Sequence, residues 1–287
     1  MTGERERREP RVALVVGAGA IKCAAGLGVY RALEQAGIPV DLVVGCSGGS
    51  ISAAQIALGW DAETACEKTT RMWTRELTKK RNKRAARQAA IPRLFGFDPA
   101  FGLIDDERIL QRLREGFGDA TFAACEIPLA ILATDFRTGE KVILRQGSLV
   151  DAIRASIAIP FIFKPWPIGD RLLIDGALSD PMPVDVAIRE RIDLILALGF
   201  DSPYQGRIDS IARFAFQVTT IMTNNLLQAN FAFQNLAHHA EVIPVLPEFG
   251  ERIKAFDTNK LPHIIECGQR AMEARLPYLE SLRRAAS

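Results

Sequence analysis

The strongest chemical signal in the sequence is a serine between glycines, in Gly45-Cys46-Ser47-Gly48-Gly49. Apolar residues 42–44 precede it and a helical pattern over 51–58 follows, so Ser47 stands on a turn between a strand and a helix. The glycines remove Cβ atoms that would clash across so sharp a turn. The helix N-terminus offers backbone N–H groups and a positive dipole end, which stabilise a developing oxyanion. The pattern predicts that Ser47 is a nucleophile.

A second candidate is the loop of small residues after the first apolar run, Gly17-Ala18-Gly19-Ala20-Ile21-Lys22. A loop of this kind that leads into a helix exposes successive backbone N–H groups, which can bind an anion. The anion would be a phosphate or a tetrahedral oxyanion. A tight turn between a strand and a helix needs the same small residues, and this simpler interpretation stays open.

The third candidate is Asp175-Gly176-Ala177, which follows the apolar residues 172–174. An aspartate before a glycine is often only a turn, but a serine nucleophile needs a base. The histidines of the chain stand in no motif; they are His238, His239 and His263. A carboxylate can take the serine proton where burial raises its pKa from about 4. We therefore expect Asp175 to contact Ser47 directly and to form a two-residue catalytic unit with it.

Short apolar runs alternate with helical patterns along the chain. Strands are predicted over 12–16, 42–44, 128–133, 141–144, 172–174, 193–198 and 241–245. Helices are predicted over 24–36, 47–58, 62–87, 105–115, 149–156, 184–189, 208–236 and 261–283. This alternation predicts an α/β fold, a three-layer sandwich with a mostly parallel central sheet. Ligands of such sheets bind beyond the carboxyl ends of the strands, and all three candidate segments follow a strand end.

Composition restricts the function classes. The chain has 287 residues, of which 48% are apolar, and a net charge of +2. No linker or repeat divides it, so we expect one domain over 1–287, with the motifs in 12–198 and a helical extension over 208–283. The near-neutral charge argues against a nucleic-acid partner.

Five scattered cysteines without a C-x-x-C pair predict neither a disulfide framework nor a zinc site, and they suit a reducing, cytoplasmic compartment. The basic N-terminus is offset by glutamates and leads into a predicted strand, so we interpret it as no targeting peptide. No uncharged apolar run reaches 18 residues, so no membrane span is expected.

In their order and spacing, these segments resemble the patatin-like phospholipase family over about residues 12–198. Two further segments carry the resemblance: a threonine–aspartate hairpin at 133–139 and an alanine–serine segment ending in proline at 155–160. The resemblance implies a lipid acyl hydrolase of phospholipase A or lysophospholipase type that needs no cofactor or metal. Ser47 would be its nucleophile and Asp175 its base.

The resemblance also assigns supporting roles. The backbone of Gly17, Ala18, Gly19 and Ala20 would bind the oxyanion, with Lys22 where the family has lysine or arginine. Gly45, Cys46, Gly48 and Gly49 would complete the nucleophile elbow, and Gly176 and Ala177 the base motif. The chain departs from the family at Cys23, which replaces a glycine; a Cβ there would restrict a positive φ. Cys46 is expected to be a small buried residue.

Three alternatives remain at this point. An acyltransferase that takes acyl groups from a thioester uses a similar elbow but usually pairs its serine with a histidine. An ordinary hydrolase triad would join Ser47, Asp175 and His238. A nucleotide-binding module would use Gly17-Ala18-Gly19, although Lys22 occupies the position of its third glycine.

A basic stripe could bring the protein to a lipid surface. Cations recur from Arg71 to Arg87, at Arg71, Arg75, Lys79, Lys80, Lys83, Arg84 and Arg87, and an aromatic loop over 91–101 follows. Each cation near anionic lipid contributes about 1 kcal/mol, so the stripe predicts a peripheral membrane contact; a solvated helix face is the alternative. Phenylalanines on the long helical stretch, Phe214 among them, are expected in the core, or else along an acyl channel or a partner face.

Overall fold

The computed structural model describes residues 9–72, 101–104, 106–200, 207–234, 240–254 and 257–286. These ranges contain one eight-stranded sheet in the order β5-β6-β3-β2-β1-β7-β8, with β4 paired to β3. The strands β3, β2, β1, β7 and β8 run parallel, whereas β4, β5 and β6 add antiparallel pairs at one side. The strands are β1 (Val12–Val16), β2 (Leu42–Cys46), β3 (Leu129–Asp135), β4 (Lys141–Leu144), β5 (Trp166–Ile168), β6 (Arg171–Asp175), β7 (Leu194–Leu198) and β8 (Glu241–Val245).

Helices cover both faces of this sheet. They are α1 (Ala25–Gln35), α2 (Gly49–Ala57), α3 (Ala62–Met72), α6 (Glu107–Phe117), α7 (Leu149–Ser156), α8 (Val184–Arg189), α9 (Ile211–Gln234), α10 (Leu261–Glu273) and α11 (Leu276–Ala286). Short 3₁₀ turns η1 (Ala20–Ala24), η2 (Phe122–Ala124), η3 (Gly176–Leu178) and η4 (Thr258–Lys260) lie in connecting segments.

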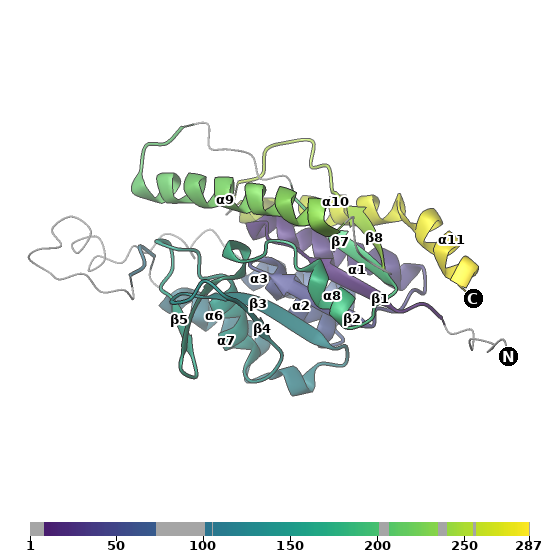
Figure 1. The fold of residues 1–287 in the computed structure, drawn as a ribbon, viewed down its shortest axis with the longest axis horizontal. Coiled ribbons are helices and arrows are strands. Elements are labelled where there is room, and N and C mark those ends of the chain that lie inside the picture. Colours follow the sequence, from purple (N-terminus) through teal and green to yellow (C-terminus); the bar gives the residue numbers. More distant parts are fainter. Residues whose placement is uncertain are drawn as a thin grey trace, which may run out of the picture.

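Side chains alternate across the central strands, which divides the core into two layers. On β1, Leu14 packs with residues of α1, α2 and α10, whereas Val15 packs with residues of α8 and with Leu227 of α9. Figure 1 shows α9 along one long edge of the molecule and α8 in front of the sheet. The predicted three-layer α/β fold is therefore confirmed.

Several boundaries differ from the sequence prediction. The helix expected over 261–283 is two helices, α10 and α11, because Pro277 cannot donate an intrahelical hydrogen bond and suits only a first turn. The three-residue strand β5 was not predicted; Pro167 lies within it, and proline is confined to the edges of sheets. The helix expected over 62–87 is described only as far as Met72, and the rest lies outside the described residues.

The antiparallel strand β6 delivers Asp175 to the site. Ser47 follows β2, whose last residue, Cys46, pairs with Leu132 of β3. The next residue of β3, Ala133, pairs with Asp175 at the end of β6. The sequence predicted Asp175 at the carboxyl end of a parallel strand, close to Ser47. Asp175 does lie close to Ser47, but its strand β6 runs antiparallel to β3. It reaches the crevice because β6 pairs only with the last three residues of β3.

Candidate active site

Ser47 and Asp175 are in direct contact, although 128 positions separate them. The Ser47 hydroxyl donates a hydrogen bond to Asp175 Oδ2 at 2.7 Å. Both residues are buried, with 6% and 3% of their surface exposed. The alternative triad would require an imidazole between the two side chains, and this direct contact leaves no room for one. His263 lies on α10, where its Nε2–H donates to the Phe249 carbonyl at 2.8 Å; His238 and His239 lie outside the described residues.

The backbone at Ser47 is left-handed, with φ of 52°, a conformation that costs a non-glycine residue about 1–2 kcal/mol. Gly45 lies in β2 and Gly48 and Gly49 begin the helical turn of α2. A Cβ on Gly45 would come within 2.6 Å of the Ser50 Cα atom, which explains the glycine there. Cys46 is fully buried, as expected. The Ser47 hydroxyl thus lies at the start of α2, where the helix dipole is positive.

Ser156 holds this turn, a role that sequence reasoning missed. The Ser47 N–H donates to Ser156 Oγ at 2.9 Å, and the Ser156 hydroxyl donates to the Leu132 carbonyl at 2.6 Å. In the sequence, the only signal for this role of Ser156 was the alanine–serine segment at 155–160. Ser156 lies at the end of α7 and is fully buried.

We predict that Ser156→Ala lowers both stability and turnover. The change leaves a buried N–H and a buried carbonyl without their partner, which costs about 1–3 kcal/mol. It also frees the left-handed turn to relax, so we expect kcat to fall about tenfold. Thermal unfolding and ester turnover on the purified variant measure the two effects. A variant with unchanged kcat would show that Ser47 needs no such support.

Asp175 is held from several sides. Its Oδ1 accepts the Ala177 N–H at 2.9 Å, its own N–H donates to the Ala158 carbonyl at 3.1 Å, and its carbonyl accepts the Thr134 hydroxyl at 2.9 Å. Gly176 and Ala177 form the start of η3. Burial raises the pKa of Asp175 to about 6, against the opposing effect of the hydrogen bonds from Ser47 and Ala177. Asp175 is thereby a stronger base than an ordinary carboxylate and is still ionised at neutral pH.

The glycine-rich loop lies beside this pair, but only part of it can donate. The Gly17 N–H donates to the Leu198 carbonyl at 3.1 Å, and the Ala18 N–H donates to the Pro181 carbonyl at 2.8 Å. These two groups are occupied, so the expectation that the whole loop supplies oxyanion donors needs correction. Among the described residues, the N–H groups of Gly19 and Ala20 have no such acceptor.

The left-handed residue of this loop is Ala20, with φ of 51°. Cys23, where a restricted positive φ was expected, lies within η1, and its thiol donates to the Gly17 carbonyl at 3.2 Å. The Cβ of Cys23 therefore restricts no positive φ, because the left-handed residue falls three positions earlier. A Cβ on Gly48 would come within 2.4 Å of the Ala20 carbonyl oxygen, so the loop and the elbow are in close contact. Lys22 is buried in η1.

An apolar cleft opens beside Ser47. It is lined by Ala20, Ile21, Ala24, Ser47, Gly48, Ile51, Ser52, Thr69, Ile157, Ile159, Phe163 and Thr258. Within the described part of the chain, no charged side chain lines it, and the polar groups there are hydroxyls and backbone. Such a lining favours an alkyl or acyl chain over a charged ligand.

Other residues that the sequence singled out have structural roles. Asp135 accepts the Arg137 and Thr138 N–H groups at 2.8 and 3.2 Å and so shapes the turn between β3 and β4. Arg154 is buried and forms an ion pair with Asp106 at 2.8 Å. Phe214 is 59% exposed on α9, so its assignment to the core was wrong.

Beyond Met72, the basic stripe from Arg71 to Arg87 lies outside the described residues, and so does most of the aromatic loop that follows it. Of the stripe, Arg71 is described, and it is exposed and paired with Glu67. None of the described helices is both long enough and apolar enough to cross a bilayer. In the same residues, no three acidic, histidine or cysteine side chains gather as a metal site would require.

The chain is similar to known proteins of one family. A family model described as patatin-like phospholipase matches residues 14–188. An uncharacterised NTE family protein of Mycobacterium tuberculosis is 33% identical over 205 residues, which cover 70% of this chain and 52% of that protein. The neuropathy target esterase of Drosophila melanogaster is 28% identical over 177 residues, covering 61% of this chain and 12% of the esterase.

Among solved structures, human GIVD cytosolic phospholipase A2 has a similar fold. It superposes with a TM-score of 0.53 at 11% identity, over 96% of this chain and 62% of that one. Identity this low shows a shared fold and no more. The chain spans about half the length of the M. tuberculosis relative.

Proposed function

Because the chain belongs to the patatin-like phospholipase family, we propose that it is a lipid acyl hydrolase that cleaves carboxylic esters with a Ser47–Asp175 dyad. The observation that carries this proposal is the direct hydrogen bond of 2.7 Å between the two side chains. A buried carboxylate with a raised pKa, in contact with a hydroxyl on a strained turn, is the arrangement that nucleophilic catalysis requires.

The mechanism follows from this geometry. Asp175 accepts the Ser47 proton as the Ser47 oxygen attacks the ester carbonyl, and the protonated Asp175 then gives that proton to the departing alcohol. The acyl group remains on Ser47 until a water, deprotonated by Asp175, attacks its carbonyl carbon. The bond to the Ser47 oxygen then breaks, Asp175 returns the proton to that oxygen, and the acyl group leaves as a carboxylic acid. The N–H groups of Gly19 and Ala20 would stabilise the oxyanion in both steps, and the loss of one such donor typically costs about 10²–10³ in rate.

We propose a lipid ester as the substrate, of phospholipid or lysophospholipid type. The apolar cleft beside Ser47 supports this choice, because it could hold the acyl chain while the ester carbonyl faces the serine. The names of the relatives point in the same direction, since they are an esterase and a phospholipase. An acyl chain in this cleft would lie against α2 through Ile51 and against the segment after α7 through Ile157.

We also propose that residues 1–287 act as one acyl-hydrolase domain. The sheet that carries Ser47 and Asp175 continues without interruption into β7 and β8. The C-terminal extension packs tightly on the motif-bearing part through α1 and α10. A Cβ on Gly28 of α1 would come within 1.8 Å of the Ile265 carbonyl oxygen of α10, a separation that only glycine permits.

The pH dependence of turnover is a direct prediction of the raised pKa. Asp175 must be ionised to accept the serine proton, and its pKa is about 6. We therefore expect kcat/KM to be nearly constant above about pH 7 and to fall tenfold per pH unit well below 6. Hydrolysis of a soluble short-chain ester between pH 4.5 and 9 measures this profile. An acidic limb centred near pH 4 would mean that burial does not raise the pKa of the base, and no acidic limb at all would mean that Asp175 is not the base.

A panel of lipid esters tests the proposed function. The purified protein would be incubated with phospholipid, lysophospholipid and triacylglycerol, and the free fatty acids quantified by mass spectrometry. We expect fatty acid release from at least one phospholipid class, and the head group and chain length that react would define the substrate. Acyl transfer from a thioester without fatty acid release would favour the acyltransferase instead, and NAD binding without ester cleavage would favour the nucleotide-binding module.

A further inference from the structure

The segment from Asp175 to Met182 supports both halves of the site. Its first residue is the proposed base, whereas Pro181, near its end, accepts the Ala18 N–H at 2.8 Å and so holds the loop of the proposed oxyanion donors. Met182 packs against the same loop, because a Cβ on Gly17 would come within 2.7 Å of the Met182 side chain. A shift of this segment would therefore displace the base and the donors together.

Asp180 fixes the middle of this segment. Its N–H donates to the Gly176 carbonyl at 3.0 Å, and its Oδ1 accepts the Met182 N–H at 3.1 Å. These two bonds connect the turn after the base with the residues that hold the loop. Asp180 is 3% exposed, so its contacts are made away from water.

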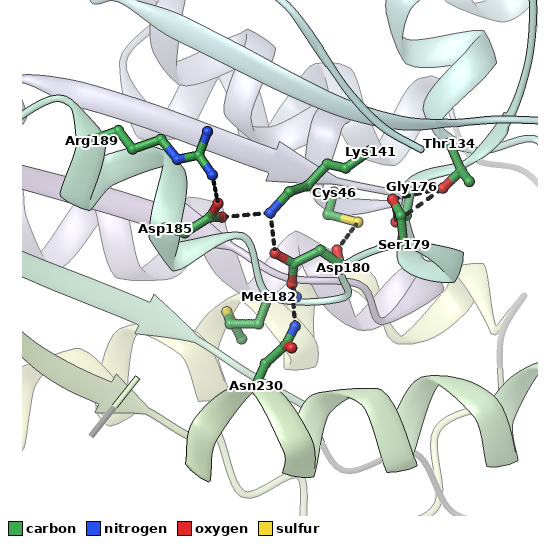
Figure 2. A network of polar contacts seen from close by, with 10 residues as sticks. All are labelled: Cys46, Thr134, Lys141, Gly176, Ser179, Asp180, Met182, Asp185, Arg189 and Asn230. Atoms are coloured by element: carbon green, nitrogen blue, oxygen red, sulfur yellow. Dashed lines mark hydrogen bonds and ion pairs between the residues drawn. The ribbon is translucent and has the colours of Figure 1, made fainter. Parts of the chain in front are cut away.

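Side chains from three other elements converge on Asp180, as Figure 2 shows. Lys141 of β4 donates to Asp180 Oδ2 at 2.9 Å, and Asn230 of α9 donates to Asp180 Oδ1 at 2.9 Å. The Cys46 thiol, next to the nucleophile, donates to the Asp180 carbonyl at 3.3 Å. The hairpin and α9 are thus connected to the carboxylate of Asp180, and the nucleophile strand to its backbone carbonyl.

The charge of Asp180 is balanced within a small cluster. Lys141 also donates to Asp185 Oδ1 at 2.8 Å, and Arg189 pairs with Asp185 at 3.4 Å. Two cations therefore face two carboxylates. Asp185 contacts the same lysine as Asp180, but no hydrogen bond or ion pair of the described residues connects its carboxylate to the segment from Asp175 to Met182. The cluster thus contains a matched pair of carboxylates, one that holds the segment and one that does not.

We infer that Asp180 is a positioning residue that fixes the base Asp175 and the oxyanion loop relative to Ser47, clamped by Lys141 and Asn230. This inference rests on the proposed dyad and extends it to residues that touch no substrate. A displacement of about 1 Å at a reacting group can cost 10²-fold in rate. Removal of the clamp should therefore lower the rate per active site without weakening substrate binding.

The test compares Asp180→Ala, Asp180→Asn, Asn230→Ala and the control Asp185→Asn. Reactive serines are counted in each variant by titration with a fluorophosphonate, and kcat and KM for a short-chain ester are expressed per titrated site. For Asp180→Ala we expect kcat per site at least tenfold below the wild-type value, with KM changed less than twofold. Asp180→Asn keeps the acceptor oxygen for Met182 and Asn230 but turns an amide donor towards Lys141, so it should recover part of the loss and stay a few-fold below wild type. Asn230→Ala should also lose a few-fold, and Asp185→Asn should stay within twofold.

A purely structural role gives a different result. It would lower the melting temperature or the number of titrated sites while kcat per site stayed intact, and that outcome would overturn the inference. If Asp180→Ala does not fold, Asp180→Asn and Asn230→Ala decide, and values equal to those of Asp185→Asn would equally overturn it. The proposed function fails separately, if wild-type protein cleaves no ester or if Ser47→Ala still does.

Discussion

The Asp175→Asn variant is expected to fold and to lose about 10²–10⁴ in kcat, the range that a general base contributes. The amide oxygen can still accept the Ala177 N–H, which Asp175 Oδ1 accepts at 2.9 Å, so the turn into η3 should persist. The amide cannot take a proton from Ser47 at neutral pH. Ester turnover per milligram, together with circular dichroism to confirm the fold, measures the effect. Turnover within tenfold of the wild-type value would exclude Asp175 as the base.

The Asp175→Asn change should also raise the free energy of unfolding at alkaline pH. The pKa of Asp175 is about 6 in the folded protein, above the ordinary value of 3.8. Folding therefore favours the protonated form, and this contribution to stability is full below about pH 4 and is lost as the pH rises through 6. At pH 8 the ionised carboxylate costs up to about 3 kcal/mol, which asparagine would not cost.

We thus expect Asp175→Asn to melt at a higher temperature than the wild-type protein at pH 8, with the difference shrinking towards pH 4. Thermal unfolding at both pH values measures it. An equal or lower melting temperature at pH 8 would show that the buried carboxylate is not under strain. A gain in stability with a loss of turnover is typical of residues retained for catalysis.

Ser47→Ala is expected to lose turnover almost completely, by up to about 10⁶-fold, because the chain then has no nucleophile for the acyl-enzyme. Lipid binding should remain, since one hydroxyl among the cleft residues contributes little apolar contact. A matched control is Ser50→Ala, which removes a buried hydroxyl that donates to the Ser47 carbonyl at 2.7 Å. That control should retain turnover within about tenfold. Equal losses in both variants would indicate damage to the turn rather than removal of the nucleophile.

The sequence predicted the layered fold and the family correctly, and the pairing of Ser47 with Asp175 that it predicted is present in the structure. These predictions rested on local patterns, a strand–turn–helix around Ser47 and an aspartate at a strand end, together with the absence of a placed histidine. Such patterns depend on backbone sterics and on short-range chemistry, which a single sequence contains. The order of the motifs along the chain then indicated the family, which no single motif did.

Features that depend on tertiary partners could not be predicted. The N–H groups of Gly17 and Ala18 are occupied by carbonyls from β7 and from the segment after η3, and no local pattern shows this. Phe214 is exposed on α9 although phenylalanine is usually buried, and the sequence of the helix alone does not show which of its faces is covered. Asp180, five residues after the base Asp175, carried no sequence signal, since its partners come from β4 and α9.

The Ser47–Asp175 dyad is best tested by mapping where a fluorophosphonate reacts with the protein and how fast. Intact protein would be labelled at pH 8, digested and analysed by peptide mass spectrometry, with labelling rates compared between the wild-type protein and Asp175→Asn. We expect a single adduct on Ser47 that forms at least 100-fold more slowly in the variant. An adduct on another residue, or equal rates in the two proteins, would contradict it.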